Sequence, residues 1–108
     1  MAALQNASLN ITTINENTVI AAVTGAQIRV YKAVILNNAA TGQTVTVNAA
    51  SGNTLAVLAL PLSLGGGVVL GNGDTSQCPE FRTATSGALI FNLSAATPVV
   101  GYLKYEIV

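Results

Sequence analysis

Residues 27–38 read QIRVYKAVILNN and form the longest uninterrupted strand-like run in the chain. Successive side chains of a β-strand point to opposite faces of the sheet. One of the two series is apolar apart from one lysine: Ile28, Val30, Lys32, Val34 and Leu36. The other series is mixed: Arg29, Tyr31, Ala33 and Ile35. We predict that the first series faces a core and that the second, which is too apolar for ordinary surface, packs against another structure. Lys32 then needs a strand bulge, a path for its ammonium group to solvent, or an acidic partner.

The rest of the chain consists of short alternating segments separated by Gly, Pro, Asn and Ser. No stretch has the spacing of an amphipathic helix, so we predict an all-β chain of about eight strands. The expected strands are residues 18–23, 27–38, 43–49, 54–60, 68–70, 80–84, 88–93 and 99–108. They predict a single antiparallel β-sandwich, either jelly-roll-like or immunoglobulin-like. The two longest strands are natural partners, and Glu106 would then face Lys32 or Arg29.

The length of 108 residues corresponds to one domain. We place the β-sandwich domain at residues 18–108. Residues 1–17 are polar, and their apolar side chains follow neither a helix nor a clean strand: Leu4, Leu9, Ile11 and Ile14. Residues 9–12 alternate briefly, so we expect an extended N-terminal arm, with room for one short strand, that docks on a neighbouring molecule; a frayed terminus is the alternative.

Charged residues make up only 7% of the chain, and the net charge is zero. An average domain contains about 25% charged residues. Polarity comes instead from Asn, Thr, Ser and Gln. This composition favours a protein whose surface is covered by neighbours in an assembly, although a soluble domain with an amide- and hydroxyl-rich coat has the same composition.

The inventory of reactive side chains predicts no enzyme, no cofactor and no metal site. The chain has no histidine and a single cysteine, Cys78, and its four acidic residues are scattered. General acid–base or nucleophilic catalysis needs a matched base and nucleophile or two neighbouring carboxylates, and zinc needs several Cys or His ligands.

Nucleic acid and membrane partners are also not expected. Nucleic-acid binding requires a clustered basic face. Arg29 and Lys32 are three residues apart in one predicted strand, so they are predicted to point to opposite faces and form no patch. No apolar run approaches the ~18 residues that span a bilayer, and the N-terminus has no basic segment followed by an apolar one, so we expect no signal peptide.

Several segments in order resemble small β-sandwich virion proteins of tailed bacteriophages, above all the head-decoration (cement) proteins. These segments are IRVYKAVILNNA, TVTVNAASG, LPLSLGGGVVL, FRTATSGALIFNLSAA and VVGYLKYEIV, and the resemblance covers about residues 18–108. It implies a homotrimer, made in the host cytoplasm, that binds the major capsid protein on the virion surface and stabilises the junctions between capsomers. It also implies that the N-terminal arm contacts the shell.

We predict that the contacts with the shell or a sister subunit come from the arm and from the second faces of the long strands: Leu4, Leu9, Ile11, Ile14, Arg29, Tyr31, Ile35 and Tyr102. The alternative is a tail or head-spike component, or a receptor- or carbohydrate-binding module on the same fold, with a site in the loop of residues 71–80. A bacterial surface or pilus subunit is disfavoured because no signal peptide is expected.

Overall fold

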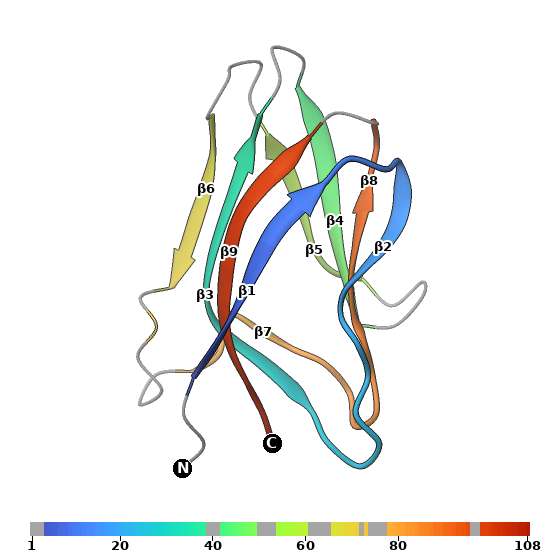
Figure 1. The fold of residues 1–108 in the computed structure, drawn as a ribbon, viewed down its shortest axis with the longest axis vertical. Coiled ribbons are helices and arrows are strands. Elements are labelled where there is room, and N and C mark those ends of the chain that lie inside the picture. Colours follow the sequence, from blue (N-terminus) through green and yellow to red (C-terminus); the bar gives the residue numbers. More distant parts are fainter. Residues whose placement is uncertain are drawn as a thin grey trace.

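A computed structural model describes residues 4–38, 42–49, 54–60, 66–71, 73, 78–95 and 98–108. Within these ranges the chain forms nine strands and no helix (Figure 1). The strands are β1 (Gln5–Ile11), β2 (Asn15–Ile20), β3 (Ile28–Asn37), β4 (Gln43–Ala49), β5 (Thr54–Leu60), β6 (Gly66–Gly71), β7 (Phe81–Arg82), β8 (Leu89–Leu93) and β9 (Val99–Ile107).

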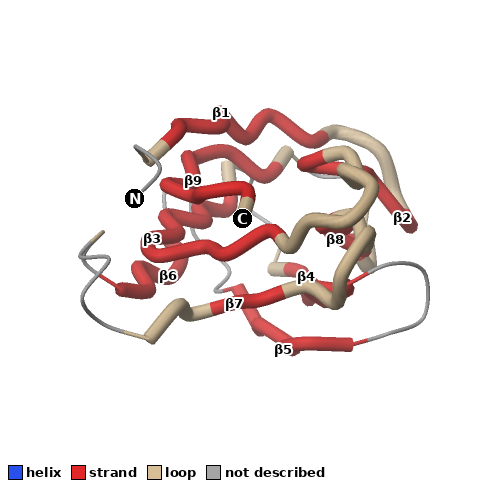
Figure 2. The backbone as a smooth tube through the Cα atoms, turned by 90° about the horizontal axis from the view of Figure 1, so that it is seen from below, coloured by secondary structure: helices blue, strands red, loops and turns tan. Residues whose placement is uncertain are grey.

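The strands form two antiparallel sheets that pack face to face (Figure 2). Sheet I has the order β1-β9-β3-β6, with β7 also pairing β3, and sheet II has the order β2-β8-β4-β5. An immunoglobulin sandwich keeps its first two strands in one sheet, whereas here β1 and β2 lie in different sheets. The interleaved order is that of a jelly roll. The predicted antiparallel sandwich is confirmed, and of its two forms the chain adopts the jelly-roll one.

The two long strands β3 and β9 are neighbours at the centre of sheet I, as predicted. Their register skips one residue of β3, because Val30 pairs Tyr105 and Lys32 pairs Lys104. Tyr31 is therefore the extra residue of a β-bulge. A one-residue insertion moves every later side chain of the strand to the other face.

The bulge corrects the predicted faces of β3. Ile28 and Val30 face the core before it, but Ala33 and Ile35 do so after it, each with 0% exposed surface. The prediction that Lys32, Val34 and Leu36 continue the core face is wrong, and so is the prediction that Ile35 lies on the second face. A bulge, a path to solvent and an acidic partner were the three expected ways to accommodate Lys32, and the structure uses the bulge.

The N-terminal residues belong to the sandwich rather than to a separate arm. Strand β1 pairs with β9 from Gln5 opposite Tyr105 to Ile11 opposite Val99, and it forms one edge of sheet I. Leu9 and Ile11 are buried in the core between the sheets. The prediction of an extended arm over residues 1–17 is wrong for residues 5–11 and 15–17, which lie in strands; residues 1–3 lie outside the described ranges.

A tight turn carries the chain from β1 in sheet I to β2 in sheet II. Asn15 has a positive φ of 72°, a conformation that asparagine tolerates better than most residues. The side-chain amide of Asn17 donates to the carbonyl oxygens of Thr13 at 2.8 Å and of Asn15 at 3.1 Å. These bonds fix the direction in which β2 enters its sheet.

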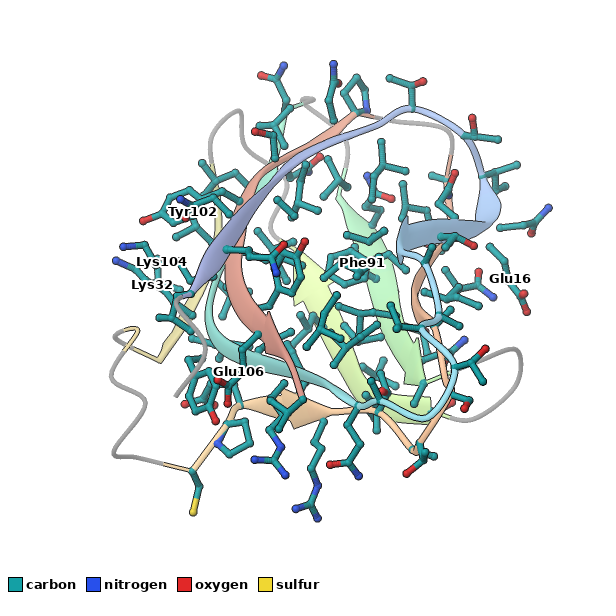
Figure 3. The ribbon with its side chains drawn as sticks, turned by 60° about the horizontal axis from the view of Figure 1, so that its bottom comes forward. Glu16, Lys32, Phe91, Tyr102, Lys104 and Glu106 are labelled. Carbon is teal, nitrogen blue, oxygen red and sulfur yellow. The ribbon has the colours of Figure 1, made fainter. Side chains whose placement is uncertain are left out.

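The core lies between the two sheets, with Phe91 of β8 near its centre (Figure 3). Its fully buried members come from both sheets: Ile28, Val30, Ala33, Ile35, Val45, Val47, Leu89, Phe91, Leu93, Val99 and Leu103. Gly101 lies in β9 opposite Leu9 on one side and Ile35 on the other, with a φ of 139°. A Cβ at this position would overlap the carbonyl oxygen of Val34, so the close approach of β3 and β9 requires glycine here.

Candidate functional site

The described residues do not assemble a reactive centre. No group of three or more His, Cys, Asp or Glu side chains within them has the arrangement to hold a metal ion. The described carboxylates lie on separate elements, with Glu16 in β2, Glu80 just before β7 and Glu106 in β9. The described part also has no helix long and apolar enough to cross a membrane. The features that this part of the chain offers to a partner are therefore the outer faces of its sheets.

The outer face of sheet I is apolar at one end. Val34 of β3 pairs Tyr102 of β9 on one side and Val69 of β6 on the other. In the next row, Leu36 pairs Val100. These five residues, which we call the apolar strip, are half-buried except Val69, which is 61% exposed. Side chains of this kind on an outer face remain available to a partner.

The other end of this face is basic. Lys32 pairs Lys104 across β3 and β9, and Arg29 pairs Arg82 across β3 and β7. These two cationic rows contain every lysine and arginine of the chain. Because of the bulge, Arg29 and Lys32 share the outer face, so the prediction that they form no patch is wrong. Like charges placed directly opposite each other in a sheet repel.

Tyr102 joins the apolar strip to the lysines. The Nζ atom of Lys32 lies 5.7 Å from the centroid of the Tyr102 ring, a cation–π distance. Lys32, Lys104 and Tyr102 project from the same part of the sheet (Figure 3). The ring therefore holds one ammonium group at the border between apolar and basic surface.

A buried polar cluster lies beside the arginine row. The hydroxyl of Tyr31, the bulged residue, donates to Oε1 of Glu106 at 2.8 Å, and both side chains are buried. This hydrogen bond and then burial raise the pKa of Tyr31, partly opposed by Arg29. Arg29 pairs Glu106 in the register, which confirms one of the two predicted cross-strand pairs. Its Nη2 atom donates to Gln27 at 3.2 Å.

The outer face of sheet II has a different chemistry. In register across β4 and β8, Thr46 lies opposite Asn92, and Asn92 in turn lies opposite Glu16 of β2. Val57 of β5, which is 63% exposed, lies beside Thr46. This face therefore carries amides, hydroxyls, one acid and the exposed Val57, and no lysine or arginine.

Four of the eight predicted contact residues are buried within this chain. Leu9, Ile11 and Ile35 belong to the core, and Tyr31 is closed off by its contact with Glu106. Their side chains are thus not open to a partner in this fold.

The other four predicted contact residues lie at or near the surface. Arg29 and Tyr102 are half-buried on the outer face of sheet I, Leu4 is half-buried before β1, and Ile14 is 44% exposed in the turn between β1 and β2. The structure brings only Arg29 and Tyr102 onto one face. Contacts by these four residues stay predictions.

Most residues of the outer face of sheet I were not among the predicted contact residues: Lys32, Val34, Leu36, Val69, Arg82, Val100 and Lys104. One signal was available, because a lysine within an otherwise apolar alternating series marks a position where the alternation breaks. The strand of residues 99–108 was predicted to pair with β3, but residue 104 was not placed opposite Lys32, and no sequence signal paired residue 82 with β3.

Comparisons of the chain with protein-family models, curated proteins and solved structures found no match. The structure establishes a small all-β protein of two packed antiparallel sheets.

Proposed function

We propose that this chain is a structural protein of a tailed-bacteriophage virion that binds the outer surface of the capsid and stabilises capsomer junctions. The observation that carries the proposal is the outer face of sheet I, where an apolar strip adjoins two cationic rows. A sheet with apolar and charged side chains side by side on its open face suits a protein that lies on a larger protein surface. The outer face of sheet II offers no such combination.

Three further observations support this proposal. The order of segments resembles head-decoration proteins over about residues 18–108. The jelly-roll order of strands is also used by viral capsid domains, although a fold alone does not decide function. The charge content of 7% suits a chain whose surface is covered by neighbours.

The proposed partner is the major capsid protein, bound through sheet I on the outside of the shell. The proposed homotrimer, and synthesis in the host cytoplasm before addition to the capsid, follow from the resemblance alone. Light scattering on the purified chain measures its oligomeric state independently of capsid binding.

The direct test uses particles produced with and without this chain. Particles that lack it should release their DNA at a lower temperature, and adding the purified chain back should restore both its presence on the head and the resistance to heat. Electron microscopy with gold-labelled antibody locates the bound chain. Label on the tail or spike would replace this proposal with the alternative one, and particles that neither contain nor bind the chain would refute it.

Two exposed valines provide a matched pair of variants for the same assay. Val69 lies on the outer face of sheet I and Val57 on that of sheet II, with 61% and 63% of their surface exposed. Val69→Asp should reduce binding to deficient particles, whereas Val57→Asp should leave it unchanged. A truncation of the N-terminal residues is not a suitable test, because it removes β1 and its core residues Leu9 and Ile11.

A further inference from the structure

We propose that the outer face of sheet I recognises a protein surface on which carboxylates lie beside an apolar patch, with the carboxylates placed between the cationic rows. This inference rests on the proposed function and adds the chemistry of the partner. Its first support is the segregation of charge: all four basic residues lie on this face, in two directly opposed pairs. Opposed like charges repel in the free protein, and a bound anionic group relieves that repulsion.

The lysine row lacks an acidic partner within the described residues. In register it contains Asn6, Lys104, Lys32 and Gly71, none of which is acidic. Glu80 lies beside Gly71 at the end of the row, yet neither lysine forms an ion pair with a described carboxylate. Within the described residues, no carboxylate therefore neutralises the two ammonium groups, and the ammonium group of Lys32 contacts only the Tyr102 ring.

The arginine row is only partly satisfied by the chain itself. Arg29 faces Glu106, whose carboxylate accepts the Tyr31 hydroxyl, and its Nε atom is buried without a hydrogen-bond partner. Arg82, opposite Arg29, is exposed. Among the described residues, the four cations thus lie beside two carboxylates, the buried Glu106 and Glu80 at the end of the lysine row, and the face retains positive charge.

The apolar strip decides between a protein and a nucleic acid as the anionic partner. Val34 and Tyr102 lie in the row next to the lysines on the same face, and Leu36 and Val100 lie in the row beyond them. Nucleic-acid backbones are bound by clustered basic side chains, and such contacts would leave the apolar strip uncovered. A protein surface that combines carboxylates with apolar side chains matches both halves of the face.

The experiment is an NMR titration of the isotopically labelled chain at low ionic strength. The probe is a synthetic peptide of alternating glutamate and leucine, and the matched control peptide has serine in place of leucine. We expect amide shifts concentrated in β3 and β9, and weaker binding of the serine peptide. The K32Q/K104Q variant should bind the glutamate–leucine peptide about tenfold more weakly, whereas K32R/K104R, which keeps the charge, should bind like the wild type. Added salt should weaken binding.

A urea unfolding curve excludes a trivial loss of fold in K32Q/K104Q. The substitution relieves the repulsion of an opposed like-charge pair and removes the cation–π contact of Lys32 with Tyr102; these effects have similar size and opposite sign, so the variant should be about as stable as the wild type. The inference is overturned if the shifts map to sheet II, if no peptide binds, or if K32Q/K104Q binds unchanged. It is also overturned if a DNA duplex binds this face more tightly than the peptide.

A further variant addresses the acid that follows Gly73 in the sequence. Asp74 lies outside the described residues, while a Cβ at Gly73 would lie 3.4 Å from the Cδ atom of Lys104. If the D74N variant bound the peptide and the wild type did not, the chain's own acid would occupy the lysines, and the inference would fail. Peptide binding to sheet I by a chain that binds no capsid would refute the proposed function and leave the partner chemistry standing. If K32Q/K104Q bound the capsid as well as the wild type, the partner chemistry would be refuted and the proposed function would stand.

Discussion

Replacement of Ile35 by alanine tests the bulge on which the surface of sheet I depends. With the bulge at Tyr31, Ile35 is fully buried between the sheets and its neighbour Val34 lies half-buried on the outer face. Without the bulge the two would exchange faces. Ile35→Ala and Val34→Ala are therefore a matched pair in which the order of the two effects reports the register of β3.

The expected magnitudes follow from burial. Truncating a fully buried isoleucine to alanine costs about 2–5 kcal/mol, because it loses both the transfer free energy and the contacts around the cavity. Truncating a half-buried valine on the open face of a sheet costs about 1 kcal/mol or less. At roughly 4–8 °C per kcal/mol for a domain near this size, Ile35→Ala should lower Tm by on the order of 10–30 °C, and Val34→Ala by less than about 8 °C.

Urea unfolding of both variants, followed by circular dichroism, measures the two free energies of unfolding. An unchanged slope with urea concentration shows that the midpoint shift reports stability rather than a change in the unfolded state. A loss in Val34→Ala equal to or larger than that in Ile35→Ala would refute the assigned bulge. The assignment of Lys32 to the outer face would then be wrong as well.

Three other substitutions test local features of the fold. Gly101→Ala should lower the free energy of unfolding in urea more than Gly25→Ala, because both glycines have a positive φ but only at Gly101 would a Cβ meet backbone atoms. A difference between the two variants below the roughly 1–3 kcal/mol of such strain would contradict this. Tyr31→Phe should cost about 1–3 kcal/mol at pH 7, because it leaves a buried oxygen of Glu106 without its donor. Because the pKa of Tyr31 is raised in the folded state, its protonated hydroxyl stabilises the fold fully below the unfolded pKa of about 10, and this stabilisation is lost as pH rises through the folded pKa. The difference in unfolding free energy between wild type and Tyr31→Phe should therefore narrow above about pH 10, and a constant difference would count against the hydrogen bond. Asn17→Ala should cost about 0.5–1.5 kcal/mol by removing two hydrogen bonds in the turn before β2, and an unchanged urea midpoint would show that they are not needed.

Local alternation predicted the strands in which one face is buried and the other open. Strand β4 spans residues 43–49 as predicted, with Val45 and Val47 in the core and Thr44 and Thr46 facing outward. In such a strand the polarity of each residue indicates whether it faces the core or the solvent, so an alternation with a period of two is sufficient to predict the strand. Strand β3 breaks this rule at one residue, and the site of an insertion depends on the partner strand, which the local pattern does not contain.

The N-terminal strand was predicted only in part, as a short strand within an arm, for a related reason. In β1 the core-facing side chains alternate as the half-buried Ala7 and the buried Leu9 and Ile11, but β1 lies at the edge of sheet I and its other face carries Asn and Ser. Its partner β9 lies about ninety residues away in the sequence, at the opposite end of the chain. Pairing at this separation is decided by the assembled core, so residues 5–11 looked like a polar arm when read alone.

The bulge at Tyr31 connects the stability of the fold with the chemistry of its surface. If the alternation of β3 continued unbroken, Lys32 would enter the core, where a charge without a partner is strongly disfavoured, and Ile35 would lie outside. The extra residue instead places Lys32 opposite Lys104 and on the same face as Arg29, while Ala33 and Ile35 complete the core. The same residue sends its hydroxyl to Glu106, which faces Arg29 across the strands. One inserted position therefore gives β3 a buried face over its whole length and gathers basic residues that are scattered in the sequence onto one open sheet.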